Sequence, residues 1–306
     1  MRKFSWLFLL LIWVVFADGK EEVFEGKDFH VYYLGGQSNM DGYGYVKELP
    51  KELSGGVPQV WIFHGNTSED GTPADGNGKW SPLNIGHGVG FSSNGKTNKY
   101  SERFGAEITF AKRLLEVYPD RNIALIKYSR GGTSIDADTK NAKRFGCWAP
   151  NWEGGNGDGT NINQYDHFLA TMANARRDAD IDNDGKADRL IPAGIIWMQG
   201  ESDASERKIA KRYKDNLTLL MYLIRKELGD METKVVVGQI ADWKVWPHRK
   251  IVRKAQVDFV NEDHNAVLVT STDMYDNSDP WHYDSKGYLD LGVRFADAVA
   301  GNKSDE

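Results

Sequence analysis

The 306-residue chain has one cysteine, Cys147, and so it cannot form a disulfide within itself. Its stability must come from an ordinary hydrophobic core, which a chain of this length can bury.

The sequence also lacks a large excess of charge of one sign, since 38 Lys and Arg balance 44 Asp and Glu to leave a net charge of -6. This balance gives no electrostatic reason to expect nucleic acid or an anionic membrane as a partner, and a neutral or cationic ligand is easier to accommodate.

No apolar run reaches the roughly 20 residues that a membrane-spanning helix needs. The longest run extends from Phe4 to Phe16, after the basic pair Arg2 and Lys3 and before Ala17. This pattern predicts a secretory signal peptide over residues 1–17, and therefore a secreted or periplasmic protein without a stable membrane span after cleavage. An uncleaved anchor is the alternative.

The rest of the chain shows no internal repeat and no linker of distinct composition, so we expect one domain over residues 18–306. Strand-like and helix-like segments alternate, which predicts an α/β fold with a mostly parallel sheet and helices on both faces. The expected strands are 29–34, 57–63, 122–128, 190–198, 234–240 and 266–270, and the expected helices are 102–117, 165–177, 208–228, 249–260 and 285–300.

Two long segments, 65–98 and 146–163, interrupt this alternation and are rich in Gly and Asn. Long connections in a compact domain are usually functional loops or disorder. Because they contain aromatic residues, among them Trp80 and Trp148, we expect ordered loops that wall a cleft and present these two side chains to substrate. The alternative is that the aromatic side chains belong to the core.

Ser38 lies in "GGQSNMDG", directly after the first expected strand. In an open α/β sheet, ligands bind beyond the carboxyl ends of the strands, where this serine is placed. Gly35 and Gly36 allow a sharp turn and a close approach of the backbone to a ligand. Ser38 is therefore a candidate nucleophile, and a helix-capping serine is the alternative.

A serine nucleophile needs a base and a group that holds the base. His282 lies in "SDPWHYDSKGY" between the last expected strand and the last expected helix, with Asp279 three residues before it. In a tight turn this spacing lets the carboxylate accept from one ring nitrogen while the other faces Ser38. A solvated turn is the alternative reading of this common pattern.

Two further strand ends contribute groups to the same edge of the sheet. "KYSRGGTSI" places Gly132 after one strand, where its backbone amide could join that of Ser38 in an oxyanion hole. "IIWMQGESDA" places Gln199, Glu201 and Asp203 after another strand. The two carboxylates could instead have structural roles, such as capping the next helix.

Together these blocks, spread from Gly35 to Tyr288, resemble the SGNH hydrolase superfamily and its branch of carbohydrate esterases, which includes sialate O-acetylesterases and acetyl-xylan esterases. The resemblance implies a three-layer α/β/α, flavodoxin-like fold. It also implies that Ser38 is the nucleophile, His282 the general base and Asp279 its orienting residue, with the Ser38 and Gly132 amides in the oxyanion hole. No metal or cofactor is required for such catalysis.

One block departs from the wider superfamily, which has Gly-x-Asn-Asp where this chain has Gly200-Glu201-Ser202-Asp203. The asparagine that serves as an oxyanion donor is therefore missing. Besides the two tryptophans, the candidates for binding substrate are Gln37, Asn39, Gln199 and Glu201.

A second group of residues precedes the fourth expected strand, in "DADIDNDGKADRL". Asp180, Asp182, Asp184 and Asp188 occupy the first, third, fifth and ninth positions of a calcium loop, with Gly185 at the bend. The twelfth position is Ile191, so the usual bidentate Glu is missing. The pattern predicts a structural calcium ion, with a solvated acidic turn as the alternative.

We therefore expect a secreted carbohydrate O-acetylesterase that removes acetyl groups from acetylated sugars through a serine acyl-enzyme. The alternative from another class is a non-catalytic, calcium-dependent glycan-binding protein. A short-chain lipase or thioesterase is less favoured, because the long loops carry Gly, Asn and Trp instead of an aliphatic surface.

Overall fold

The computed structural model describes residues 24–66, 75–140, 142–152 and 163–301. The expected signal peptide lies outside the described residues, as do parts of both expected loops. Among the described residues, no helix has the length and apolar character needed to cross a membrane.

A seven-stranded sheet forms the centre of the molecule, with the strand order β11-β10-β9-β1-β8-β3-β4. Its parallel strands are β1 (Asp28–Gly36), β3 (Val57–His64), β8 (Asn122–Ser129), β9 (Arg189–Met198), β10 (Val235–Gly238) and β11 (Ala266–Val269). The short edge strand β4 (Ser81–Leu83) runs antiparallel to β3. All six expected strands are present: the central strands are apolar runs buried between the two helical layers, and β11 at the edge of the sheet is an apolar run that is half-buried.

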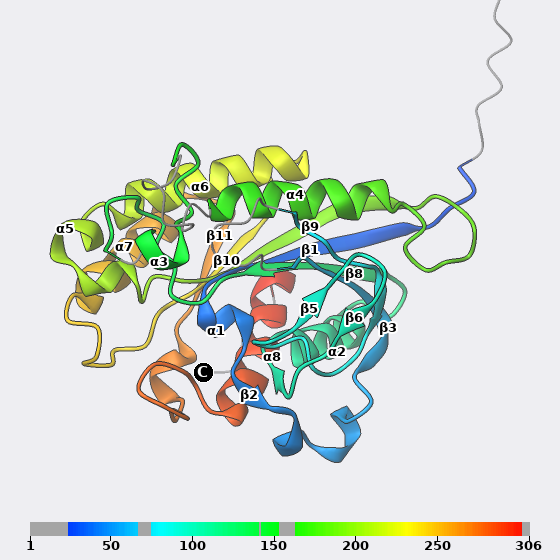
Figure 1. Ribbon diagram of the computed structural model, residues 1–306, viewed down its shortest axis with the longest axis horizontal. Helices are drawn as coiled ribbons and strands as arrows, with labels where there is room; N and C mark the ends of the chain where they lie inside the picture. The colour runs from blue at the N-terminus through cyan, green and yellow to red at the C-terminus, as the bar shows by residue number, and fades with distance from the viewer. Residues whose placement is uncertain (1–23, 67–74, 141, 153–162, 302–306) are drawn as a thin grey trace, which may run out of the picture.

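Helices cover both faces of this sheet (Figure 1). The helices α4 (Gln164–Arg177) and α6 (Tyr213–Leu228) lie on one side, and α2 (Glu107–Val117) and α8 (Ser285–Ala300) lie on the other. The helix α7 (Arg249–Glu262) packs beside α6 and β11. The predicted three-layer α/β/α architecture is thus confirmed.

Two expected helices differ from the observed ones by more than one or two terminal residues. The segment 102–117 becomes helical only at Glu107, because Arg103–Phe104 form strand β7 and pair with β2 (Gly44–Tyr45). The segment 208–228 is divided into α5 (Arg207–Ala210) and α6. Local apolar spacing does not reveal such interruptions.

The first of the two long segments is more regular than expected. It contains β4, the small hairpin of β5 (Ser92–Ser93) and β6 (Asn98–Lys99), and several buried side chains. Trp80 is one of them, since its indole packs on Phe63 and donates to the carbonyl of Ala175 at 3.0 Å. The remaining short helices are α1 (Ser38–Asp41) and α3 (Ala142–Phe145).

Candidate active site

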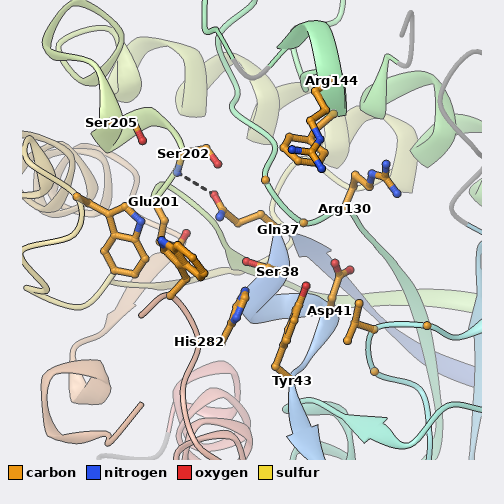
Figure 2. A pocket seen from close by; sticks show the side chains of 18 of the residues that line it. Gln37, Ser38, Asp41, Tyr43, Arg130, Arg144, Glu201, Ser202, Ser205 and His282 are labelled. Carbon is orange, nitrogen blue, oxygen red and sulfur yellow. Dashed lines mark hydrogen bonds between the residues drawn. The ribbon is translucent and has the colours of Figure 1, made fainter. Parts of the chain in front are cut away.

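The carboxyl ends of β1, β8 and β9 and the loop before α8 surround a cavity of about 830 Å³. Figure 2 shows Ser38 and His282 beside each other at its centre. Other polar and charged residues that line the cavity are Gln37, Asp41, His64, Arg130, Arg144, Glu201, Ser202 and Ser205, and its aromatic residues are Tyr43, Phe91, Phe145, Trp246 and Trp281.

Ser38 is the first residue of the short helix α1, which starts where β1 ends. Gln37 occupies the N-cap position without a side-chain cap bond, so Ser38 is not a capping serine. The turn requires Gly36, whose φ is 146° and where a Cβ atom would lie 2.0 Å from the Met198 carbonyl oxygen. The hydroxyl of Ser38 is therefore held at the cavity wall by the backbone of two adjacent strands.

His282 and Asp279 form a close pair in the loop before α8. Nδ1 of His282 lies 2.7 Å from Oδ2 of Asp279, whose Oδ1 accepts the backbone amides of Trp281 and His282 at 2.8 and 2.9 Å. Although partial burial opposes it, these hydrogen bonds hold the pKa of the Asp279 carboxyl below its ordinary value. An ionised carboxylate beside Nδ1 keeps the proton of the neutral imidazole on Nδ1. Nε2 then carries no proton and can accept one from a hydroxyl group.

Tyr43 covers one face of this imidazole. The two ring centroids are 3.5 Å apart and the rings are inclined by 6°. Tyr43 is placed there by Gly42, which has a φ of 96° and packs against Gly105, and by the β2–β7 pairing that begins at the next residue. The imidazole is thus restrained on one edge by Asp279 and on one face by an aromatic ring.

Gly131 and Gly132 line the cavity in the loop after β8. Gly132 has a φ of 78°, a conformation that favours glycine, and a Cβ there would lie 2.7 Å from the ring of Phe145. Buried hydrogen bonds fix the following residues: Asp203 accepts from the Ser134 hydroxyl at 2.8 Å and from the Ile135 amide. These contacts give the loop a rigid backbone, as preorganised oxyanion donors require.

Gln37 and Asn39 flank Ser38 but differ in what they present to the cavity. Oε1 of Gln37 receives the backbone amides of Gly200 and Ser202 and the side chain of Gln199, so the NH₂ group points away from these donors. Gln37 lines the cavity and can offer this NH₂ group to a ligand. Asn39 is 1% exposed and its side chain is engaged by hydrogen bonds to Glu201, Trp281 and Tyr288, so the structure does not support a direct contact with substrate.

Glu201 lies in the cavity wall and is 1% exposed. Its Oε1 accepts from Asn39 Nδ2 at 2.7 Å, whereas its buried Oε2 has no hydrogen-bond partner among the described residues. Burial raises the pKa of this carboxyl to about 7, against the effect of the Asn39 hydrogen bond. Glu201 is therefore a buried carboxyl in the cavity wall whose second oxygen has no hydrogen-bond partner among the described residues.

Three predicted substrate contacts are wrong in this structure. Trp80 is a core residue, and Trp148 is fully buried against Trp197 and Tyr128. Gln199 is also fully buried and donates to the Thr133 carbonyl and to Asp203, so it supports the glycine loop instead of lining the cavity.

The tryptophans that do line the cavity are Trp246 and Trp281, which the sequence reasoning missed together with Tyr43, Arg130 and Arg144. Trp281 is 51% exposed although it adjoins His282. A signal was present for three of the five, because Tyr43, Arg130 and Trp281 lie within or directly beside the blocks that carried the other candidates.

The aspartate-rich loop lies at the opposite edge of the sheet, where β9 begins. Carboxylate oxygens of Asp180, Asp182 and Asp188 lie within 4.8 Å of one another, whereas Asp184 is outside this group. The ammonium of Lys27 bonds to both Asp182 and Asp184. Three of the four predicted ligands thus come together, and a lysine already neutralises part of their charge.

The sequence matches one family, described as "Carbohydrate esterase, sialic acid-specific acetylesterase", over residues 28–301. No curated protein matches the chain. Among solved structures, a protein from Arabidopsis thaliana is 21% identical with a TM-score of 0.62, and the match covers 89% of this chain and 98% of that one.

Two further structures show the same fold. XAC1771, a carbohydrate acetylesterase from Xanthomonas citri, is 18% identical with a TM-score of 0.59, and the match covers 90% of this chain and 57% of that one. NanS is 17% identical with a TM-score of 0.55, and the match covers 90% of this chain and 98% of that one. At these identities the likeness shows the fold alone.

Proposed function

The chain belongs to the carbohydrate esterase family of sialic acid-specific acetylesterases, which are SGNH-type serine carboxylic ester hydrolases, and from this premise we propose that it removes acetyl groups from an acetylated sugar by a Ser38-His282-Asp279 mechanism. The observation that supports this best is the 2.7 Å contact between His282 and Asp279 in the cavity that Ser38 also lines.

In the proposed mechanism, Nε2 of His282 takes the proton of the Ser38 hydroxyl as its oxygen attacks the acetyl carbonyl carbon. The carbonyl oxygen becomes an oxyanion, which the Ser38 and Gly132 amides stabilise, and the NH₂ group of Gln37 is a third donor within the cavity wall. The His282 imidazolium then protonates the departing sugar oxygen, leaving an acetyl-enzyme. A water molecule, deprotonated by His282, releases acetate and restores Ser38.

We propose a sugar that bears a carboxylate as the natural substrate. The family description names sialic acid, and Arg130 and Arg144 line the cavity. The net charge of -6 favours a neutral or cationic ligand for the protein as a whole. Arg130 and Arg144, however, place two cationic side chains in the cavity wall. These arginines and the polar side chains beside them also favour a sugar over the acyl chain of a lipid or thioester. The esterase family favours an enzyme over a non-catalytic glycan-binding protein.

Acetate release from 4-nitrophenyl acetate, acetylated xylan and O-acetylated sialic acid tests this proposal, with Ser38→Ala, Asp279→Asn and the remote surface variant Ser54→Ala in parallel. We expect Ser38→Ala to lose at least a thousand-fold in kcat, roughly the effect of removing a serine nucleophile, and Asp279→Asn to retain partial activity. Ser54→Ala should match the wild type. Wild-type turnover by Ser38→Ala would refute the nucleophile.

We also propose that residues 1–17 are a signal peptide and that residues 18–306 form one secreted or periplasmic domain. The basic start and the short apolar run support this, and the family match over residues 28–301 supports a single unit. Sequencing of the amino terminus of the exported protein tests the cleavage site, and retention of Met1 in that protein would contradict it.

A further inference from the structure

Glu201 is a titratable side chain of the cavity wall to which the proposed mechanism gives no role. Among such side chains of the described residues, it is the one with a buried oxygen that lacks a hydrogen-bond partner. It follows Gly200, whose φ of 135° turns the chain at the end of β9. Figure 2 shows Glu201 on the same side of the cavity as Ser202, near Ser38 and His282.

The two carboxyl oxygens of Glu201 have different surroundings. Oε1 is fixed by Asn39 Nδ2 at 2.7 Å, and the same Nδ2 donates to the Trp281 carbonyl at 3.2 Å. The carboxyl is therefore tied to the residues that adjoin Ser38 and His282 in the chain. Oε2 is buried and has no partner among the described residues.

A buried polar atom without a hydrogen bond is costly, and native proteins rarely retain one without a reason. Oε2 is shielded from solvent but belongs to a cavity-lining residue, so a ligand whose binding shifts this carboxyl slightly can supply the missing partner. Burial raises the pKa of the Glu201 carboxyl to about 7, so both the acid and the carboxylate are present near neutral pH. A hydroxyl group pairs with either form, because it can donate to a carboxylate and accept from an acid.

We propose that Oε2 of Glu201 binds a free hydroxyl group on the same sugar that carries the acetyl ester, and that this contact makes the enzyme prefer partially acetylated sugars. This inference rests on the proposed function, since it assumes that the cavity binds an acetylated sugar. Trp246 and Trp281 line the same cavity and offer flat apolar surfaces to such a ring. Glu201 is thus a specificity-determining residue, distinct from the triad.

The test compares kcat/KM for a monoacetylated sialic acid, whose other hydroxyls are free, with kcat/KM for the fully acetylated sugar, counting the first acetate released. The variant is Glu201→Gln, which keeps an oxygen for Asn39 but presents an NH₂ group in place of Oε2. We expect the wild type to prefer the monoacetylated sugar, and the variant to lose about ten-fold of that preference, mainly through KM. Glu116→Gln, on the exposed side of α2, serves as the control and should keep the full preference.

The inference is overturned if Glu201→Gln keeps the wild-type preference, or if the wild type hydrolyses both sugars equally well. A purely structural role of Glu201 would lower activity on both sugars and on 4-nitrophenyl acetate by the same factor, and would therefore leave the preference unchanged. Failure of the proposed function looks different, because the wild type would then release no acetate from either sugar.

Discussion

Asn39 Nδ2 lies 2.7 Å from Glu201 Oε1, and this contact joins the block that carries the nucleophile to the block that ends β9. The same NH₂ group donates to the carbonyl of Trp281, and Oδ1 of Asn39 accepts from the Tyr288 hydroxyl at 2.8 Å. One buried amide therefore connects the residue after Ser38, the residue before His282 and helix α8. Its place beside Ser38 serves alignment instead of substrate contact.

Asn39→Asp should disturb this connection because it replaces two donor bonds with a second carboxyl next to Glu201. We expect a loss of about 2–4 kcal/mol in the free energy of unfolding, larger at pH 8 than at pH 5, where protonation relieves the repulsion. Activity on 4-nitrophenyl acetate should fall along with it. Urea unfolding at both pH values measures the effect.

Tyr288→Phe is the matched control for Asn39→Asp, since it removes only the bond to Asn39 Oδ1. It should cost about 1 kcal/mol in the free energy of unfolding, with no marked dependence on pH in this range. Equal losses in the two variants, or a loss in Asn39→Asp that is the same at both pH values, would contradict the alignment role.

Tyr43→Leu should lower kcat because the imidazole of His282 then loses the aromatic ring that stacks on its face. A stacked ring restrains the imidazole and stabilises its cationic form, an effect of roughly 0.5–2 kcal/mol that corresponds to a loss of about two- to thirty-fold. Tyr43→Phe keeps the ring and should retain most of the activity. Steady-state kinetics on 4-nitrophenyl acetate separate kcat from KM, and a Tyr43→Leu enzyme with wild-type kcat would show that the stacking has no catalytic effect.

The pKa values of Glu201 and Asp203 predict how stability depends on pH. Burial raises them to about 7 and about 6, so the folded protein binds more protons at these sites than the unfolded chain does between about pH 4 and pH 7. The stability that these two groups contribute is fully present below about pH 4 and is lost as the pH rises through 6 and 7. For Glu201 the change is on the order of 3 kcal/mol.

The difference between the wild type and Glu201→Gln isolates the Glu201 part of this dependence, because Asp203 and the other titrating groups are common to both proteins. Relative to the wild type, the variant should become more stable as the pH rises from 5 to 8. Unfolding by urea at several pH values gives this difference directly. A difference that does not vary with pH would mean that Glu201 titrates normally.

The sequence predicted the sheet and the Asp279–His282 contact well because both depend on local information. Six apolar runs marked six strands, and a spacing of three residues across Pro280 brought two side chains together. The sequence did not distinguish the buried Trp80 and Trp148 from the cavity-lining Trp246 and Trp281. Whether a loop tryptophan points into the core or into the cavity depends on contacts with residues far along the chain. The indole of Trp80, for example, bonds to Ala175 on α4.

The calcium site predicted from the aspartate-rich loop stays a prediction, and the structure indicates how to test it. Lys27 bonds to Asp182 and Asp184, so a calcium ion would have to compete with its ammonium for Asp182. We therefore expect calcium to raise the melting temperature of the wild type by a few degrees over chelator, and to raise that of Lys27→Met by more. Asp182→Asn should abolish both shifts. If calcium and chelator give the same melting temperature in the wild type and in Lys27→Met, the loop is a solvated acidic turn whose charge is balanced by the lysine alone.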